Sequence, residues 1–251
     1  MDESIAVSIS GKITTLSSSY FPAINEHENS EIALLGLHTY NMFPNVNETN
    51  NNIRIIVPER GQNLDINLPF GCYEIEDITQ YISNKIHEDN EHLNEVNQSK
   101  IYDPIDFTMH ADMTSAKCVI NCNYQVDFSI ENSLASLLGF KREIYGKAGS
   151  TSSFRSSKNI DINAINSIKV LCNVANGSFD NGLQSHSIYE FFPRERSGAK
   201  IIEVPTNLIY YKLNTEILNT ININLVDQGN NPIHNFEEKI TVVLHIRRCK
   251  S

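Results

Sequence analysis

The chain has 251 residues, of which 40% are hydrophobic, and it carries a formal net charge of -10 with a sequence pI of about 5.2. This length allows one large β domain or two small ones. The charge argues against a duplex-DNA binder that works by neutralising phosphates, and no apolar run approaches the roughly 20 residues that span a bilayer.

The first residues lack the basic start and continuous apolar segment of a secretory signal, so we expect no export by that route and no membrane association. The five cysteines are scattered and odd in number: Cys72, Cys118, Cys122, Cys172 and Cys249. Without a signal sequence, reduced thiols are the expectation.

The chain begins with two short alternating segments, 5–9 and 13–16, which suit an edge strand or an arm. We expect an N-terminal arm over about residues 1–30. Residues 31–41 form a better strand, and apolar residues on both of its faces suggest a place inside a sandwich. An Asn/Pro-rich loop follows, and then two short strands at 53–57 and 65–68.

Residues 71–87 break the β pattern because isoleucines recur there at helical spacing. The stripe consists of Ile75, Ile78, Ile82 and Ile86. It predicts one amphipathic helix lying across a sheet or the mouth of the sandwich, followed by a loop over 88–98. Helix and loop together form an expected insertion over about residues 71–104.

Three short strands are predicted at 105–112, 116–121 and 124–129. Residues 133–140 read as one or two helical turns, capped by Ser133 and ended at Gly139. Residues 141–163 are polar and rich in Gly and Ser, and we expect an exposed loop there. Further strands are predicted at 167–175, 186–192 and 200–204.

The clearest pattern lies between residues 207 and 248, where two segments alternate apolar and polar residues. The apolar positions are Ile221, Ile223, Leu225, Ile240, Val242, Leu244 and Ile246. A period of two places them on one face of each strand, so they should fill the sandwich. The polar faces, with Asn222, Asn224, His245 and Arg247, should meet solvent or a neighbour. The connection is long, so the pair forms either a long-loop hairpin or strands of two sheets.

No residue set predicts a catalytic, cofactor or metal site. Cys118 and Cys122 are spaced to share one face of a strand, as two zinc ligands could. A second Cys/His pair at zinc-finger spacing is missing, so we interpret them as two small buried residues. His110 with Asp112, and His186 with Glu190, fit an acid/base pair only loosely. The sequence contains no GxSxG elbow and no phosphate-binding glycine loop.

Basic residues cluster at 194–200 and 247–250, and we interpret both clusters as solvated surface. The 10 Tyr and 11 Phe include Tyr189, Phe191, Phe192, Tyr210 and Tyr211. Their rings could stack on the bases of single-stranded nucleic acid, but core packing and protein contacts fit an acidic chain better. About a dozen short strands with few helices predict a Greek-key β-sandwich or barrel.

Short motifs, taken in order, resemble the minor capsid protein of Polinton/Maverick elements and adintoviruses, a single jelly-roll penton protein. The motifs are LSSSYFPAI (16–24), LLGLHTYNMFPNVNETNNN (34–52), FGCYEIEDITQYI (70–82), NSLASLLGF (132–140), and the terminal VDQGNNPI with EKITVVLHIRR. The resemblance implies an all-β fold, a jelly-roll-type antiparallel β-sandwich with one amphipathic helix and short helical turns. We therefore expect a single jelly-roll domain over 1–251, with insertions at about 71–104 and 141–163.

The resemblance also implies a structural capsid protein of the virion that forms homopentamers at the fivefold vertices of an icosahedral particle. Its partners would be copies of itself and a double jelly-roll major capsid protein, with no cofactor, no enzymatic activity and no specific contact with nucleic acid. The alternative is a carbohydrate- or receptor-binding β-sandwich. A cupin-type enzyme would require histidines and a carboxylate that converge inside the barrel.

Overall fold

The computed structural model describes residues 4–61, 63–96, 103–147, 149–162 and 165–248. The chain forms two compact units, one made of Met1–Phe43 with Ile165–Ser251 and the other of Pro44–Ala164. Each unit has a buried apolar core of its own. The sequence led us to expect one domain over residues 1–251, whereas the contacts within the chain gather around these two cores.

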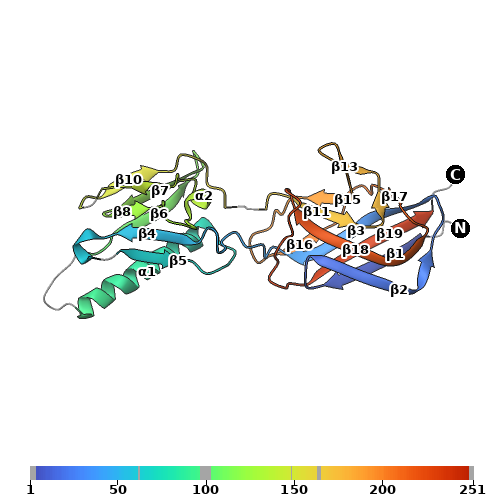
Figure 1. The fold of residues 1–251 in the computed structure, drawn as a ribbon, viewed down its shortest axis with the longest axis horizontal. Helices are drawn as coiled ribbons and strands as arrows, with labels where there is room; N and C mark the ends of the chain where they lie inside the picture. The colour runs from blue at the N-terminus through green and yellow to red at the C-terminus, as the bar shows by residue number, and fades with distance from the viewer. Residues whose placement is uncertain (1–3, 62, 97–102, 148, 163–164, 249–251) are drawn as a thin grey trace. The chain divides into compact units, whose positions relative to one another are not determined.

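The first unit consists of antiparallel strands in two main sheets and one small hairpin (Figure 1). Its strands are β1 (Ser4–Gly11), β2 (Thr15–Asn25), β3 (Ser30–Tyr40), β11 (Ile168–Cys172), β12 (Ala175–Asn176), β13 (Ser178–Asp180), β14 (Leu183–Ser185), β15 (Ser187–Phe191), β16 (Lys200–Glu203), β17 (Tyr211–Leu213), β18 (Ile217–Asp227) and β19 (Ile240–Arg248). One sheet has the order β1-β19-β3-β17-β12, with β16 also paired to β3, and the other has the order β15-β11-β18-β2.

This pairing order is that of a jelly roll. The principal strands of the first unit, in chain order, are β1, β2, β3, β11, β15, β16 with β17, β18 and β19. The first, eighth, third and sixth lie side by side in one sheet, and the second, seventh, fourth and fifth in the other. Apart from the fourth and fifth strands, which pair with each other, successive strands lie in different sheets, and the two inner faces share one core. The predicted jelly-roll fold class is confirmed.

The last two long strands lie in different sheets, which decides between the two alternatives for the terminal block. β18 pairs with β2 and β11, while β19 pairs with β1 and β3. The predicted inward residues are all buried: Ile221, Ile223, Leu225, Ile240, Val242, Leu244 and Ile246. The predicted register of both strands is confirmed, because a slip of one residue would have turned these side chains outward.

Of the two alternatives for the N-terminus, an edge strand or an arm, the structure shows edge strands over the residues that it describes. Residues 4–25 form β1 and β2, the edge strands of the two sheets. Val7, Ile9 and Leu16 are buried in the core, so apolar burial stabilises these strands in the sheets. Residues 1–3 lie outside the described residues.

The second unit has two small antiparallel sheets and a helix. Its elements are β4 (Asn52–Ile56), the 3-10 turn Pro58–Arg60, β5 (Leu64–Asn67), α1 (Ile75–Val96), β6 (Phe107–Asp112), β7 (Lys117–Cys122), β8 (Gln125–Asp127), α2 (Ala135–Leu138), β9 (Ile144–Tyr145) and β10 (Ser152–Arg155). The sheets have the orders β10-β7-β6 and β5-β4-β8-β9.

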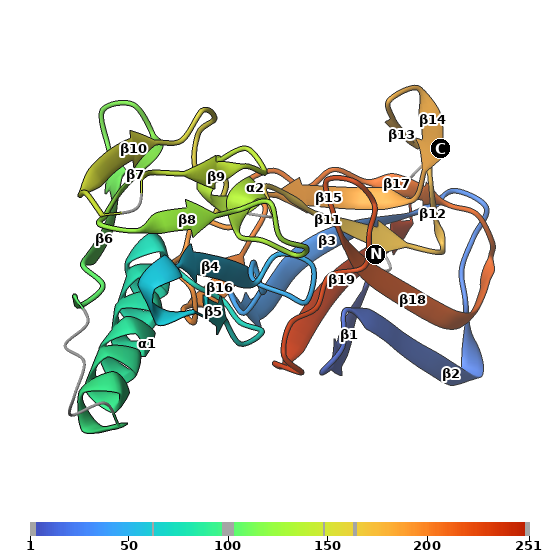
Figure 2. The ribbon, with the colours of Figure 1, turned by 60° about the vertical axis from the view of Figure 1, so that its left-hand side comes forward.

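The predicted helix is present and its isoleucine stripe is buried. α1 packs on β6, as Figure 2 shows. The expected loop after His87 is wrong up to residue 96, because α1 continues. Asp89 pairs with Arg60, and Asn90 accepts a hydrogen bond from Ile105 N at 3.1 Å, so neighbouring segments hold this part of the helix. No helix in the described ranges is long and apolar enough to cross a membrane.

The prediction of a plain polar loop at 141–163 is also wrong. This segment contributes β9, which pairs with β8, and β10, which pairs with β7. Tyr145 and Phe154 stack at 5.4 Å and meet Phe140 at 5.1 and 5.9 Å, so aromatic packing orders the segment. Residues 148 and 163 lie outside the described residues.

The short helix α2 ends as predicted but starts differently. Gly139 ends it in the left-handed conformation, with φ 77°. Ser133 does not cap it, because its hydroxyl donates to the Phe128 carbonyl at 2.8 Å.

Candidate functional site

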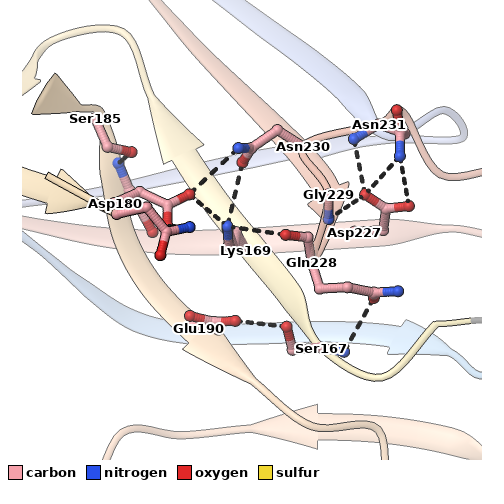
Figure 3. Close-up of polar contacts among 12 residues, drawn as sticks. Ser167, Lys169, Asp180, Ser185, Glu190, Asp227, Gln228, Gly229, Asn230 and Asn231 are labelled. Atoms are coloured by element: carbon pink, nitrogen blue, oxygen red, sulfur yellow. Dashed lines mark hydrogen bonds and ion pairs between the residues drawn. The ribbon is translucent and has the colours of Figure 1, made fainter. Parts of the chain in front are cut away.

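A buried lysine marks the most constrained polar cluster of the first unit. Alternation along β11 sends Ile168, Val170 and Cys172 into the core and Lys169 to the outer face of the sheet. Lys169 is nevertheless only 5% exposed. It is bonded to the β13–β14 hairpin and to the turn at 227–231, which lie over it (Figure 3).

Three acceptors surround the Lys169 ammonium. Nζ donates to Asp180 Oδ2 at 2.6 Å, to the Gln228 carbonyl at 3.2 Å and to Asn230 Oδ1 at 3.4 Å. These acceptors match the three N–H donors of a lysine. The hydrogen bond from Lys169 is the main reason why the pKa of Asp180 lies below its ordinary value. A buried charge is tolerated here because it is fully paired.

The turn at 227–231 is held by Asp227. Its Oδ1 accepts hydrogen bonds from the backbone N–H groups of Gly229 and Asn231, both at 2.8 Å. Burial alone would raise the pKa of Asp227, but the hydrogen bonds from Asn231 and Gly229 lower it overall. The turn is therefore preorganised to present Asn230 and the Gln228 carbonyl to Lys169.

The hairpin held by Lys169 exposes two large apolar side chains. Its tip is Asn181-Gly182, both with positive φ, as a tight two-residue hairpin turn requires. Phe179 is 73% exposed and Leu183 is 74% exposed. Isolated two-stranded ribbons are only marginally stable in water. The bonds that Asp180 makes with Lys169 Nζ at 2.6 Å and with Asn230 Nδ2 at 3.2 Å help to fix this hairpin to the sheet. The arrangement suits contact with another molecule rather than catalysis.

The outer face of the other sheet carries a second polar cluster. Tyr210 Oη and His245 Nδ1 are hydrogen-bonded at 2.8 Å, and the Arg247 guanidinium lies 3.4 Å from the centroid of the Tyr210 ring. Arg247 also pairs with Glu31 at 3.2 Å. His245 and Arg247 lie on the outward face as predicted, and partners within the chain hold both of them.

The loosely fitted acid/base pairs are not assembled. His186 Nδ1 donates to the Ala175 carbonyl at 2.7 Å, whereas Glu190 accepts from Ser167 Oγ at 2.5 Å. Asp112 accepts from Ser115 Oγ at 2.7 Å and pairs with Arg155 at 3.1 Å, and His110 is exposed on the same strand.

The cysteine pair is buried. Cys118 and Cys122 share the inner face of β7, and burial raises the pKa of the Cys118 thiol to about 12. The described residues contain no group of three or more His, Cys, Asp or Glu side chains placed to hold a metal ion. The interpretation of the two cysteines as small core residues fits this burial.

The aromatic and basic candidates divide between core and surface. Phe191 is buried and stacks with Tyr189 at 6.3 Å, while the adjacent Phe192 is 60% exposed, so these rings do not form one platform. Arg194 and Arg196 are exposed in the loop before β16, and Lys200 is exposed at the start of that strand, so the expected solvated surface is present at 194–200. Sequence reasoning missed Lys169, although a charge within the apolar segment SIKVLCNVA was a signal for a covered ion pair.

The fold of this chain is similar to that of a solved viral protein. No protein-family model and no curated protein matches this sequence. Among solved structures, the crystal structure of the mavirus penton protein matches with a TM-score of 0.51 and 10% sequence identity, over 98% of this chain and 100% of that chain. The matched span therefore includes both units. The predicted resemblance to a Maverick-type penton protein is confirmed at the level of the fold.

Proposed function

We propose that this chain is a minor capsid protein, the penton of a Polinton/Maverick element or adintovirus, located in the virion. The observation that carries the proposal is the jelly-roll strand order of the first unit, in a chain whose fold matches the mavirus penton protein over 98% of its length. In this role the protein forms pentamers at the fivefold vertices of an icosahedral particle. Its second partner is a double jelly-roll major capsid protein.

A closed ring of five needs two unlike surfaces on each copy, because one patch must meet a different patch on the neighbour. The first unit offers two such surfaces. The β13–β14 hairpin exposes Phe179 and Leu183. The other sheet exposes Ile202, at 59%, and Val204, at 62%, on and just after β16. These four apolar side chains support contacts between copies.

A structural role fits the described polar groups better than an enzymatic one. The buried Lys169 is engaged by Asp180 and Asn230, and His245 is bonded to Tyr210. Each group holds two parts of the fold together. We therefore propose that these clusters stiffen a building block.

Electron microscopy of the purified chain, alone and mixed with the major capsid protein of the same element, tests the proposal. We expect fivefold rings, or vertex density that fits five copies. A chain that stays monomeric at high concentration in both samples would contradict the proposal. Selective binding on a glycan array by that monomer would instead favour the alternative of a carbohydrate-binding sandwich.

A further inference from the structure

The second unit contains a hollow of about 880 Å³ that none of the roles above uses. Its floor includes the buried side chains of Ala135 and Phe140 and the half-buried Ile160. Lys117, Arg142, Lys158 and Asp161 line it as well. Its volume falls in the range of ligand pockets, and an apolar floor with a few charged groups is the usual composition of such pockets.

The walls of the hollow are held by backbone hydrogen bonds. Lys158 N donates to the Gly139 carbonyl, and Asp161 N donates to the Leu137 carbonyl, both at 2.9 Å. At Gly139 a Cβ atom would lie 2.4 Å from the Lys158 carbonyl oxygen, so the two segments approach as closely as a glycine allows. The hollow is therefore preformed, which lowers the entropic cost of binding.

The charge of the lining is opposite to that of the chain. The lining contains three cations, Lys117, Arg142 and Lys158, and one carboxylate, Asp161, whereas the net charge of the chain is -10. No ion pair within the described ranges involves these three cations. Arg142 and Lys158 are exposed, so both are available to a ligand.

This lining favours an acidic peptide over a nucleic acid. A nucleic-acid site typically has a row of cations that follows the phosphates, whereas here three cations line a hollow together with apolar residues and a carboxylate. Phe140 and Ile160 offer contacts to an apolar side chain. Asp161 repels phosphates and carboxylates alike, but its carboxylate can accept a hydrogen bond from a peptide N–H, which a nucleic-acid backbone lacks.

We propose that this hollow is a binding site for an acidic peptide segment of a partner protein, in which carboxylates stand beside an apolar side chain. The carboxylates pair with the exposed Arg142 and Lys158, and the apolar side chain packs on the half-buried Ile160. This site is separate from the contacts between copies proposed for the first unit, and its occupancy can be measured whether or not the protein forms rings.

The test is fluorescence polarisation with the full chain and a labelled hexapeptide that alternates glutamate and phenylalanine. The same peptide with glutamine in place of glutamate, inorganic phosphate and oligothymidylate serve as competitors. The variant Arg142→Glu with Lys158→Glu is compared with Lys212→Glu, a matched change of an exposed lysine in the first unit. Circular dichroism checks folding, and Arg142→Gln with Lys158→Gln replaces the double reversal if that variant does not fold.

We expect the acidic peptide to bind, the double variant to bind about tenfold more weakly, and Lys212→Glu to bind like the wild type. The affinity should fall with added salt, because the rim cations are exposed. Equal binding of the glutamine peptide, or unchanged binding by the folded double variant, would overturn the proposal. Displacement of the peptide by phosphate or oligothymidylate at equal charge concentration would overturn it too, because it would show a general polyanion site.

Discussion

Lys169 Nζ lies 2.6 Å from Asp180 Oδ2, and this ion pair joins strand β11 of the sandwich to the hairpin that covers it. The lysine side chain is 7% exposed and the aspartate side chain 26%. Water is therefore largely excluded from the ammonium, and the carboxylate takes its place as a partner. The pair fixes the position of the hairpin whose apolar side chains we propose as a contact surface.

Replacing the lysine should release the hairpin. Lys169→Met keeps an unbranched side chain that matches the aliphatic part of lysine but removes its charge and its three hydrogen bonds. Because the hairpin has little core of its own, its amides at 178–185 should exchange with solvent at least about tenfold faster. Hydrogen exchange read by mass spectrometry measures this. Core strands such as β19 should keep their protection, as should all regions in the control Lys212→Met. Unchanged protection of the hairpin in Lys169→Met would contradict the role of Lys169 in holding the hairpin.

Acid should release the same hairpin. The pKa of Asp180 is lowered in the fold, mainly by the hydrogen bond from Lys169, so the ionised carboxylate stabilises the folded state. This stabilisation is fully present above the unfolded pKa of about 3.9 and is lost as the pH falls through the lower folded value. Hairpin protection should therefore persist from pH 7 down to about pH 4 and fall below it. Asp180→Asn should show weak protection over this whole range. Loss of wild-type protection already between pH 7 and pH 5 would point to another titrating group.

Two adjacent residues of β19 should differ sharply in their effect on stability. Leu244 is fully buried, so Leu244→Asp places a carboxylate in the core. Burying an unpaired carboxylate costs several kcal/mol, which rivals the whole free energy of unfolding of about 5–15 kcal/mol, so this variant should not fold. His245→Ala loses its hydrogen bond to Tyr210, which is worth about 1 kcal/mol, and the chain should stay folded. Circular dichroism and thermal unfolding measure both variants. The opposite ranking would mean that the register of β19 is wrong.

The exposed hairpin should matter for assembly rather than for folding. Phe179→Ser with Leu183→Ser removes two side chains that are 73% and 74% exposed, so the unfolding temperature should change little. The proposed pentamers should dissociate at about tenfold higher protein concentration, since apolar residues at the centre of an interface carry much of its binding energy. Analytical ultracentrifugation measures the fractions of monomer and pentamer. The matched control is Ile13→Ser, which removes a side chain that is 61% exposed between β1 and β2. Equal weakening by both variants would remove the hairpin from its proposed place in the interface.

Local patterns allowed most strands and the long helix to be predicted. The alternation of Leu244 and His245 gave the correct face for each, because the period of two in a strand is independent of its partners. The end of α1 was missed, because the contacts of Asp89 and Asn90 with Arg60 and Ile105 are long-range.

The division into two units had no local signal. Ile168 and Ile120 lie in equally ordinary alternating strands, yet they belong to different cores. Which strands share a core depends on long-range pairing, and periodicity carries no information about it. The segment at 141–163 was misjudged for a related reason: Tyr145 and Phe154 find their aromatic partners only in the folded unit.

The candidate site was also hidden from local reasoning. The Asn181-Gly182 turn signal is present, but a single apolar residue on either side, Phe179 and Leu183, does not form an alternating strand pattern. Lys169 was visible as a charge in an apolar strand. Its partner Asp180 could not be predicted, because it reaches Lys169 only when the hairpin folds back over the sheet.

Native mass spectrometry of the purified protein, with and without the major capsid protein, shows whether the chain builds fivefold vertices. We expect a complex of five times the chain mass of 28.4 kDa, formed by the protein alone or on addition of the major capsid protein. A chain that remains monomeric in both samples, at concentrations where the protein is fully folded, would contradict it.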